Sequence, residues 1–475
     1  MSPVLDKARL PAAVLAAKTA RIASRALKRG GGSTYPGIVA RRVDPKVLAR
    51  LSRRLTQGSV AITGTNGKTT TTRMVSEILR ATGVGVVNNS TGANLVTGVT
   101  AALVSDASLS GRPASEMGVF EVDEASAPGV AAEAELFILA VLNLFRDQLD
   151  RYGELAYVGK VIASAFEDLS PNGAVVLNAD DPLVASLGRG AKKAVFFGVD
   201  DPALGTGTLQ HVADSKDCPV CGAALSYDAV YFGHVGTYRC LNCSFARPEP
   251  LYVARNVRMD GPKGTDFLLK TPEGEYEARI GLPGLYNVYN ALSAAAVSGE
   301  AEVRSEVVVR GLRGFSGAFG RVERVKAGEK EVFLLLIKNP VGFNEILRTF
   351  VASPNDKAKA DAARHVLIAI NDNHADGRDV SWLWDVDFEM LASTRVNASP
   401  RFSVSGIRAE DMAVRLKYAE LPVGDIISDR KDALLAALDA TPPGETLYVL
   451  PTYTAMLELR QTLSDLGYTH PFWED

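Results

Sequence analysis

The chain has 475 residues, 47% of them hydrophobic and 23% charged, with a formal net charge of -3. This length allows two or three domains with separate cores. There is no run of about eighteen apolar residues, and the basic N-terminus lacks a continuous apolar segment, so neither a membrane span nor a secretory signal is expected, and the cytoplasm is the expected compartment.

A basic segment, residues 1–56, is predicted to be helical. Residues 1–50 carry eleven Lys and Arg against two Asp, a local charge of +9 that leaves -12 for the rest of the chain. Basic residues three or four apart share one helix face here: Lys18, Arg21, Arg25 and Lys28. A solvated face is the first interpretation, and contact with an anionic surface such as lipid headgroups is the alternative.

Residues 57–319 alternate short apolar strands with helical patterns. Strands are predicted at 59–63, 117–122, 136–142, 174–178 and 194–198, and a returning helix at 284–297. Nearly continuous apolar strands between helices indicate a parallel sheet covered on both faces, which is an α/β nucleotide-binding domain. A second alternation, with strands at 331–337, 365–370, 401–405 and 446–450, predicts a Rossmann-like domain over 320–475.

The segment GlyThrAsnGlyLysThrThr, residues 64–70, joins the first strand to a helix. A glycine-rich turn there points backbone N–H groups and the positive helix end at phosphate oxygens. Lys68 can then reach the β- and γ-phosphates of a nucleotide, and the Thr69 hydroxyl can bind Mg²⁺. The loop is shorter than usual, because Ile62 stands where a glycine is common. A turn that merely joins strand to helix is the alternative.

Carboxylates follow the later strands at the same expected sheet edge. Glu121 ends the strand at 117–122 and is the first candidate for the metal, with Asp123 and Glu124 expected to be more distant or solvated. The segments AsnLeuPheArgAspGlnLeuAsp (143–150) and LeuAsnAlaAspAspPro (177–182) follow the next two strands. Ordinary helix caps remain an alternative for each of them.

All four cysteines lie within 26 residues of the chain. Cys218 and Cys221 form one CxxC pair and Cys240 and Cys243 another, with eighteen residues between the pairs. Four thiolates at this spacing are typical of a structural, tetrahedral Zn²⁺ site. The four cysteines lie in a predicted zinc ribbon of about residues 205–250, inserted into the nucleotide-binding domain. Arg239 is the one Lys or Arg from 218 to 243, which is too little basic charge for this ribbon to bind a nucleic acid.

Together these motifs, with LeuTyrAsnValTyrAsnAla (285–291) and GlyArgValGlu (320–323), resemble the Mur ligases in their order along the chain. These ATP-dependent enzymes activate a carboxylate as an acyl phosphate in peptidoglycan precursor assembly. The resemblance implies an ATP cradle at Gly64, Thr65, Asn66, Gly67, Lys68, Thr69 and Thr70, and Mg²⁺ ligands at Thr69 and Glu121. It further implies contact with the adenine region from Asn287, and with the sugar or phosphates of the nucleotide from Arg321 and either Asp180 or Asp181. Gln148 stands where the family usually has a His that helps to hold a second metal.

The segments LysAsnProValGlyPheAsnGlu (338–345) and 371–389 resemble one branch, the MurT-type subunits of lipid II isoglutaminyl synthase. The resemblance implies ATP-dependent amidation of the D-glutamate α-carboxyl of lipid II, at the inner membrane face, with ammonia from a GatD-type glutamine amidotransferase. It agrees with the cysteine count, because every cysteine is in the ribbon and none remains as a glutaminase nucleophile.

The same resemblance implies that an aspartate of this chain supports the partner's catalytic His. Asp379 is the first candidate, and Asp376 and Asp385 are alternatives. Loop stabilisation by Asx-type hydrogen bonds is an equally good interpretation of Asp376 and Asp379. Two other functions stay open, a stand-alone ligase that adds an amino acid and a non-catalytic ATP-binding module that docks nucleic acid through the basic segment. The acidic balance of the remaining residues disfavours the second.

Overall fold

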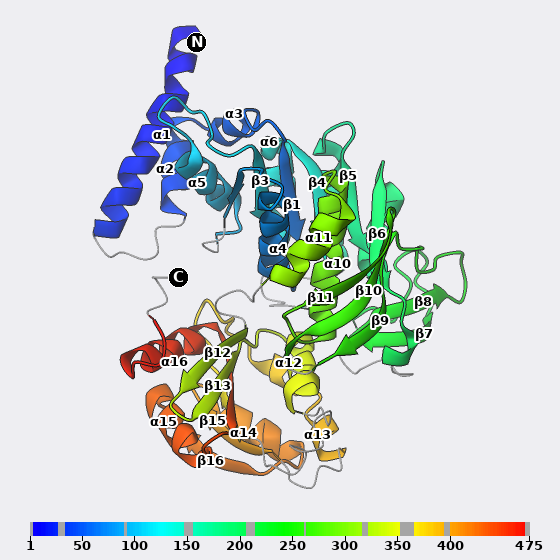
Figure 1. Cartoon of the computed structure of the whole chain (residues 1–475), viewed down its shortest axis with the longest axis vertical. Helices are drawn as coiled ribbons and strands as arrows, with labels where there is room; N and C mark the ends of the chain where they lie inside the picture. Colours follow the sequence, from blue (N-terminus) through cyan, green and yellow to red (C-terminus); the bar gives the residue numbers. More distant parts are fainter. Residues whose placement is uncertain are drawn as a thin grey trace.

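The computed structural model describes residues 3–26, 34–89, 93–146, 155–205, 214–260, 263–315, 322–351, 365–393 and 400–470. They form a nine-stranded sheet, a six-stranded sheet and a two-stranded hairpin (Figure 1). Within these ranges, no helix combines the length and the apolar composition needed to cross a bilayer.

Three helices precede the first strand: α1 (Pro3–Ala26), α2 (Tyr35–Val43) and α3 (Val47–Ser52). The helix α1 buries Leu10 and Val14, which belong to the same hydrophobic cluster as residues of α3 and α5 (Val96–Asp106). Its N-terminal end projects from the rest of the molecule (Figure 1). The side chain of Arg25 and all of Lys28 lie outside the described residues, so the basic face predicted here is only partly described.

The central sheet has the order β11-β10-β9-β6-β5-β4-β1-β3-β2. Its strands are β1 (Ser59–Thr63), β2 (Val86–Asn88), β3 (Met117–Glu121), β4 (Leu136–Val141), β5 (Ala174–Asn178), β6 (Ala194–Val199), β9 (Tyr252–Met259), β10 (Thr265–Thr271) and β11 (Gly274–Ile280). The strands from β2 to β9 pair in parallel, as predicted. The pairs β9–β10 and β10–β11 are antiparallel, so the sheet is mixed and the purely parallel prediction is wrong at this edge.

Helices cover both faces of the central sheet. On one face lie α4 (Lys68–Arg80), α10 (Leu285–Glu300) and α11 (Ser305–Gly314), and on the other lie α5, α6 (Ala127–Ala134), α8 (Leu155–Ser164), α9 (Pro182–Leu187) and the N-terminal helices. Neighbouring side chains of β1 alternate between the two cores, because Val60 and Ile62 belong to one cluster and Ala61 to the other. Both faces are therefore apolar, and functional groups are left to the strand ends.

The cysteine segment forms the hairpin of β7 (Leu225–Phe232) and β8 (Val235–Cys240), and it connects the adjacent strands β6 and β9. Two tyrosines attach the hairpin to the central domain. Tyr231 Oη donates to the carbonyl of Val199 at 3.1 Å, and Tyr238 Oη donates to the carbonyl of Ala179 at 3.0 Å. The hairpin is thus fastened to the ends of β5 and β6.

The six-stranded sheet has the order β12-β13-β17-β14-β15-β16. Its strands are β12 (Val322–Ala327), β13 (Lys330–Leu335), β14 (His365–Ala369), β15 (Arg401–Ser405), β16 (Val423–Ile427) and β17 (Thr446–Pro451), all parallel except β12. One face is covered by α12 (Pro340–Ile346), α13 (Glu389–Ser393) and α14 (Ala409–Tyr418), and the other by α15 (Arg430–Ala440) and α16 (Tyr453–Asp465). The predicted α/β architecture is confirmed, with β12 and β16 as additions.

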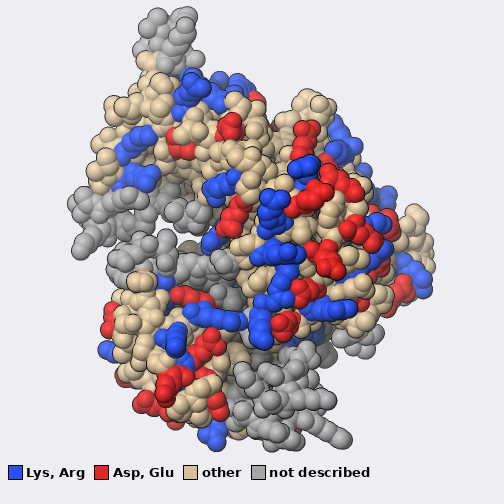
Figure 2. Space-filling model, in the orientation of Figure 1, with Lys and Arg blue, Asp and Glu red and all other residues tan. Residues whose placement is uncertain are grey.

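The surface charges are unevenly distributed. Figure 2 shows mainly Lys and Arg on the N-terminal helices, whereas basic and acidic side chains are interspersed over the central domain. Part of the basic charge is paired, since Arg41 of α2 forms an ion pair with Glu133 of α6 at 2.7 Å. The interspersed charge of the central domain is typical of an ordinary solvated surface, whereas the N-terminal helices keep an excess of basic side chains.

Candidate active site

The phosphate loop, residues 64–67, connects β1 to α4 and depends on two glycines. Gly64 has φ +126° and Gly67 has φ +90°, both in the region that favours glycine. A Cβ on Gly64 would lie 2.9 Å from the carbonyl oxygen of Asn143, and one on Gly67 would lie 2.0 Å from Asn290 Oδ1. Both backbone angle and available space therefore exclude side chains at these two positions.

Lys68 is the first residue of α4, and its side chain is nearly buried. The Nζ atom donates to the carbonyl oxygen of Gly64 and lies 3.2 Å from Glu124 Oε1. Glu124 is itself buried and contacts Lys68, so of the two expected positions the solvated one is excluded and the one further from the metal agrees with the structure. It supplies the negative charge that makes a buried ammonium group tolerable beside the loop.

Thr69, in the first turn of α4, contacts Glu121, the last residue of β3. The Thr69 hydroxyl donates to Glu121 Oε2 at 2.7 Å, so a hydroxyl and a carboxylate lie together next to the loop. Asn89 fixes the backbone at Glu121, because its Oδ1 accepts from the Glu121 N–H at 2.9 Å and its Nδ2 donates to the Glu121 carbonyl at 2.7 Å. Oxygen ligands of this kind suit Mg²⁺. The two predicted ligands are brought together, and the contact from Asn89 was not anticipated.

Asn143, just after β4, fixes the middle of the loop. Its Oδ1 accepts from the Asn66 N–H at 2.8 Å, and its Nδ2 donates to the Asn66 carbonyl at 3.1 Å. Thr65 makes a similar pair with Phe145, because its Oγ1 accepts from the Phe145 N–H at 2.9 Å and donates to the Phe145 carbonyl at 3.2 Å. Asn143 and Phe145, at the start of the segment predicted to supply polar ligands, therefore support the loop, and residues 147–150 of that segment lie outside the described residues.

Asn287 reaches the loop through a neighbour on α10. Asn290 Nδ2 donates to Asn287 Oδ1 at 3.0 Å, and Asn290 Oδ1 occupies the space beside Gly67. Asn287 Nδ2 in turn donates to the carbonyl of Pro283 at 2.7 Å. The structure thus brings Asn287 to the edge of the loop, with Asn290 between them. Thr70 is buried in the first turn of α4.

Asp180 does not lie open to a nucleotide. Its side chain is fully buried, Oδ1 accepts from Arg247 Nε, and Oδ2 accepts from Tyr289 Oη at 2.6 Å and the Val199 N–H at 2.7 Å. Burial raises the pKa of Asp180, and the charge of Arg247 offsets part of that rise. Both carboxylate oxygens are thus occupied by hydrogen bonds where the central sheet, the hairpin and α10 meet. The nucleotide role expected for Asp180 is therefore not supported.

Both carboxylate oxygens of Asp181 are also occupied by hydrogen bonds within the protein. Its Oδ1 caps α9 by accepting from the N–H groups of Leu183 and Val184, and Oδ2 accepts from the Leu144 N–H at 2.9 Å. This is the helix-cap alternative that the sequence left open. Two further predicted positions, Arg321 and Gln148, lie outside the described residues.

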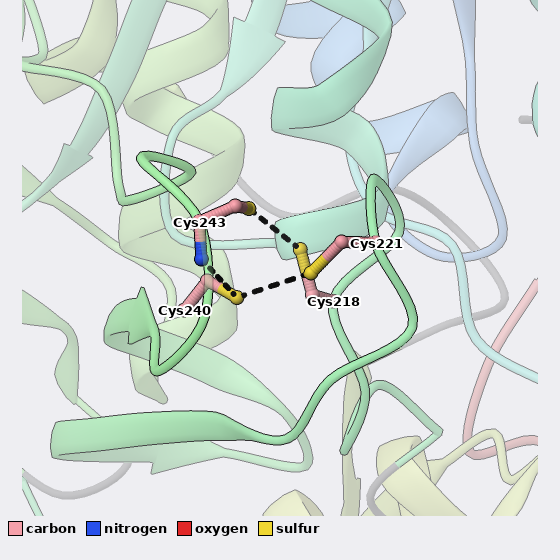
Figure 3. Close-up of side chains that lie close together, drawn as sticks. All are labelled: Cys218, Cys221, Cys240 and Cys243. Atoms are coloured by element: carbon pink, nitrogen blue, oxygen red, sulfur yellow. Dashed lines mark hydrogen bonds between the residues drawn. The ribbon is translucent and has the colours of Figure 1, made fainter.

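The four cysteines converge in one cluster (Figure 3). Their Sγ atoms all lie within 4.8 Å of one another, with Cys218 and Cys243 3.7 Å apart and Cys221 and Cys240 3.4 Å apart. Tetrahedral Zn–S bonds of about 2.3 Å require sulfur atoms roughly 3.8 Å apart, so the donor set fits zinc. The N–H groups of Asn242 and Cys243 donate to Cys240 Sγ and lower the pKa of that thiol to about 6.

Comparisons with known proteins agree with this geometry. A family model described as the Mur ligase middle domain matches residues 62–246, and one described as MurT ligase C-terminal matches residues 336–456. The Staphylococcus aureus (strain N315) protein named "Lipid II isoglutaminyl synthase (glutamine-hydrolyzing) subunit MurT" is 34% identical over 456 residues, 95% of this chain and 97% of that protein. The chain belongs to the MurT family.

A second MurT protein, from Streptococcus pneumoniae (strain ATCC BAA-255 / R6), is 32% identical and covers 92% of this chain and 93% of its own length. The fold is shared more widely than the sequence. A pseudomurein peptide ligase type C from Methanothermus fervidus superposes with a TM-score of 0.67 at 23% identity, covering 88% of this chain and 80% of that one. The Mur ligase-like α/β fold predicted from the motifs is therefore confirmed.

The MurT-specific match includes the three candidate aspartates. Asp376 accepts from the Thr454 N–H at 2.8 Å through Oδ1, and from the Thr454 hydroxyl through Oδ2, so both oxygens stabilise the loop. Asp379 is exposed, and its Oδ1 accepts from the Ser381 N–H at 2.8 Å, which holds its pKa below the usual value. Asp385 is also exposed. Asp379 keeps an outward-facing carboxylate, although it makes the Asx-type contact as well.

Proposed function

We propose that this MurT chain is the ligase subunit that uses ATP to amidate the D-glutamate α-carboxyl of the lipid II stem peptide. The ammonia would come from a separate GatD-type glutamine amidotransferase. The observation that carries the proposal is the meeting of Lys68, Thr69 and Glu121 at one phosphate loop, in a chain that matches MurT relatives over nearly its whole length.

The chemistry needs two steps. A carboxylate oxygen attacks the γ-phosphorus of ATP, the bond to the β-phosphate oxygen breaks, and ADP leaves. The lone pair of ammonia then attacks the acyl carbon, phosphate leaves with the bonding pair, and a proton is lost from nitrogen to give the amide. Both steps build negative charge on phosphoryl oxygens, which a lysine and oriented N–H groups stabilise.

The residues divide this work as follows. The N–H groups at the start of α4 would bind the phosphates, and Lys68 would neutralise the transferring phosphoryl group. Thr69 Oγ1 and Glu121 Oε2, 2.7 Å apart, would hold Mg²⁺, which supplies charge stabilisation when bound. Asn287 would lie at the adenine end, and Arg321 would contact the nucleotide. The four cysteines would hold one structural zinc ion.

We assign domains as 1–56 for the basic helices, 57–319 for ATP binding with the ribbon at about 205–250, and 320–475 for partner binding. The C-terminal assignment is supported by Asp379, whose exposed carboxylate would orient the partner's catalytic His. The absence of any cysteine outside the ribbon supports an external ammonia source. The lipid II substrate would be met at the inner membrane face.

The test compares nitrogen sources. The purified chain with ATP and lipid II should form D-isoglutamine with high ammonium alone, and with glutamine only when the amidotransferase is added. Carboxylate oxygen labelled with ¹⁸O should appear in the released phosphate, because the acyl phosphate breaks at the carbonyl carbon. Efficient ligation of a free amino acid, or unlabelled phosphate, would contradict the proposal.

A further inference from the structure

The N-cap of α12 reaches the phosphate loop from the six-stranded domain. Asn339 Nδ2 donates to Asn66 Oδ1 at 2.9 Å, and Asn66 Nδ2 lies 3.4 Å from Asn339 Oδ1, although 273 positions separate the two residues. Asn339 is 2% exposed, and its Oδ1 also accepts from the Gly342 N–H at 2.9 Å, which caps α12. One buried side chain therefore both starts a helix and holds the loop.

The two sides of Asn66 are held by different parts of the chain. Its backbone N–H and carbonyl pair with Asn143, which follows β4 of the central sheet. Its side-chain amide pairs with Asn339. Because Asn143 fixes the backbone alone, the amide of Asn66 is the part of the loop whose orientation depends on α12.

Apolar contacts accompany the amide pair. A Cβ on Gly233, at the turn between β7 and β8, would lie 3.0 Å from Phe145 Cε1 and 3.7 Å from both Cγ atoms of Val341. Val341 belongs to α12, and Phe145 is the residue bound by Thr65 of the loop. The hairpin, the residue bound by Thr65 and α12 are thus in contact, which gives α12 a second point of attachment to the central domain besides the amide pair.

We propose that Asn339 is a positioning residue for phosphoryl transfer, which acts by holding the amide of Asn66 and so fixes the phosphate loop against α12. The inference rests on the proposed function, because its main readout is the ammonium-driven reaction. A neutral hydrogen-bonded pair of this kind is expected to change kcat/KM for ATP about five-fold.

The variant Asn339→Ser separates the two tasks of the residue. Serine is a good N-cap, so α12 stays capped, but its hydroxyl is too short to reach Asn66. Asp429→Ser is the matched control, since Asp429 caps α15 of the same domain by accepting from the Asp432 N–H at 2.9 Å. Asn339→Ser should lower kcat/KM for ATP about five-fold, with KM for ammonium and the melting temperature close to those of Asp429→Ser.

The partner variant Asn66→Ala tests the pairing. If the two amides act together, Asn66→Ala and the double variant Asn66→Ala/Asn339→Ser should lose about as much as Asn339→Ser alone. If the fold-losses of the two single variants multiplied in the double variant, the proposal would be overturned. Wild-type kcat/KM for ATP in Asn339→Ser would overturn it too. Affinity for Mg·ATP, measured by calorimetry without lipid II, gives a second readout. A wild-type chain that binds ATP but forms no amide refutes the proposed function and leaves this test intact.

Discussion

Replacing Gly67 with alanine should cripple the phosphate loop while leaving the fold in place. Gly67 has φ +90°, where an L-residue costs about 1–2 kcal/mol. The new Cβ would also lie 2.0 Å from Asn290 Oδ1, far inside ordinary contact. Asn290 must then rotate and lose its 3.0 Å bond to Asn287, which costs about another 1–3 kcal/mol in a buried site.

Gly83 supplies a closely matched control. It lies just beyond the other end of α4 with φ +91°, and a Cβ there would meet nothing within 4 Å. Gly83→Ala therefore carries the backbone cost without the clash. The difference between the two variants isolates the steric term, about 2 kcal/mol, which converts to roughly thirty-fold in kcat/KM for ATP.

The assay is ammonium-driven amidation over a range of ATP concentrations, with urea unfolding of each variant. Gly83→Ala should lower the free energy of unfolding by about 1–2 kcal/mol and Gly67→Ala by about 2–5 kcal/mol, and only Gly67→Ala should lose activity. Gly67→Ala/Asn290→Ala should recover part of the loss, because the Cβ then has room. The reasoning would be refuted if Gly67→Ala and Gly83→Ala showed the same kcat/KM for ATP.

Four further outcomes are expected. Lys68→Ala should abolish ADP formation with either nitrogen source, and residual turnover above background would remove its phosphoryl role. Asp379→Asn should spare the ammonium reaction and slow the glutamine reaction, whereas equal loss in both would contradict a role toward the partner. Cys221→Ser should lower the zinc content from about one ion per chain and lower the melting temperature, and unchanged metal content would exclude the four-thiolate site. Burial raises the pKa of Glu345 from 4.5 to about 7, only partly offset by Arg348 3.4 Å away. The folded chain therefore holds a proton that the unfolded chain has released, and the free energy of unfolding should fall by up to about 3 kcal/mol between pH 5 and 8. Glu345→Gln should flatten that fall, and an unchanged slope in urea unfolding would count against it.

The phosphate loop was predictable because its determinants are local. A strand, two glycines, a lysine and a helix start occupy twelve consecutive positions, and Glu121 ends the neighbouring strand in the register that parallel pairing gives. The cysteine cluster was predictable for the same reason, since each CxxC pair comes from one turn. Residues close in sequence carry most of both sites.

The contacts that the sequence did not predict join residues that are far apart along the chain. Asp180 follows a strand as a ligand would, but Arg247 and Tyr289, 67 and 109 positions away, enclose it. The sequence left Glu124 either solvated or more distant from the metal, because nothing local shows that it pairs with Lys68. The pair of Asn66 and Asn339 spans 273 positions, and LysAsnPro gave no sign of its partner.

The path of the chain between β6 and β9 has a consequence for how the central sheet folds. These two strands pair in the sheet, yet the whole cysteine hairpin lies between them in the sequence. Closing so long a connection costs chain entropy, and an ion held by the four cysteines, as proposed, would link Cys218 to Cys243 and shorten the free length of the connection. Binding of that ion would therefore lower the entropy cost of pairing β6 with β9.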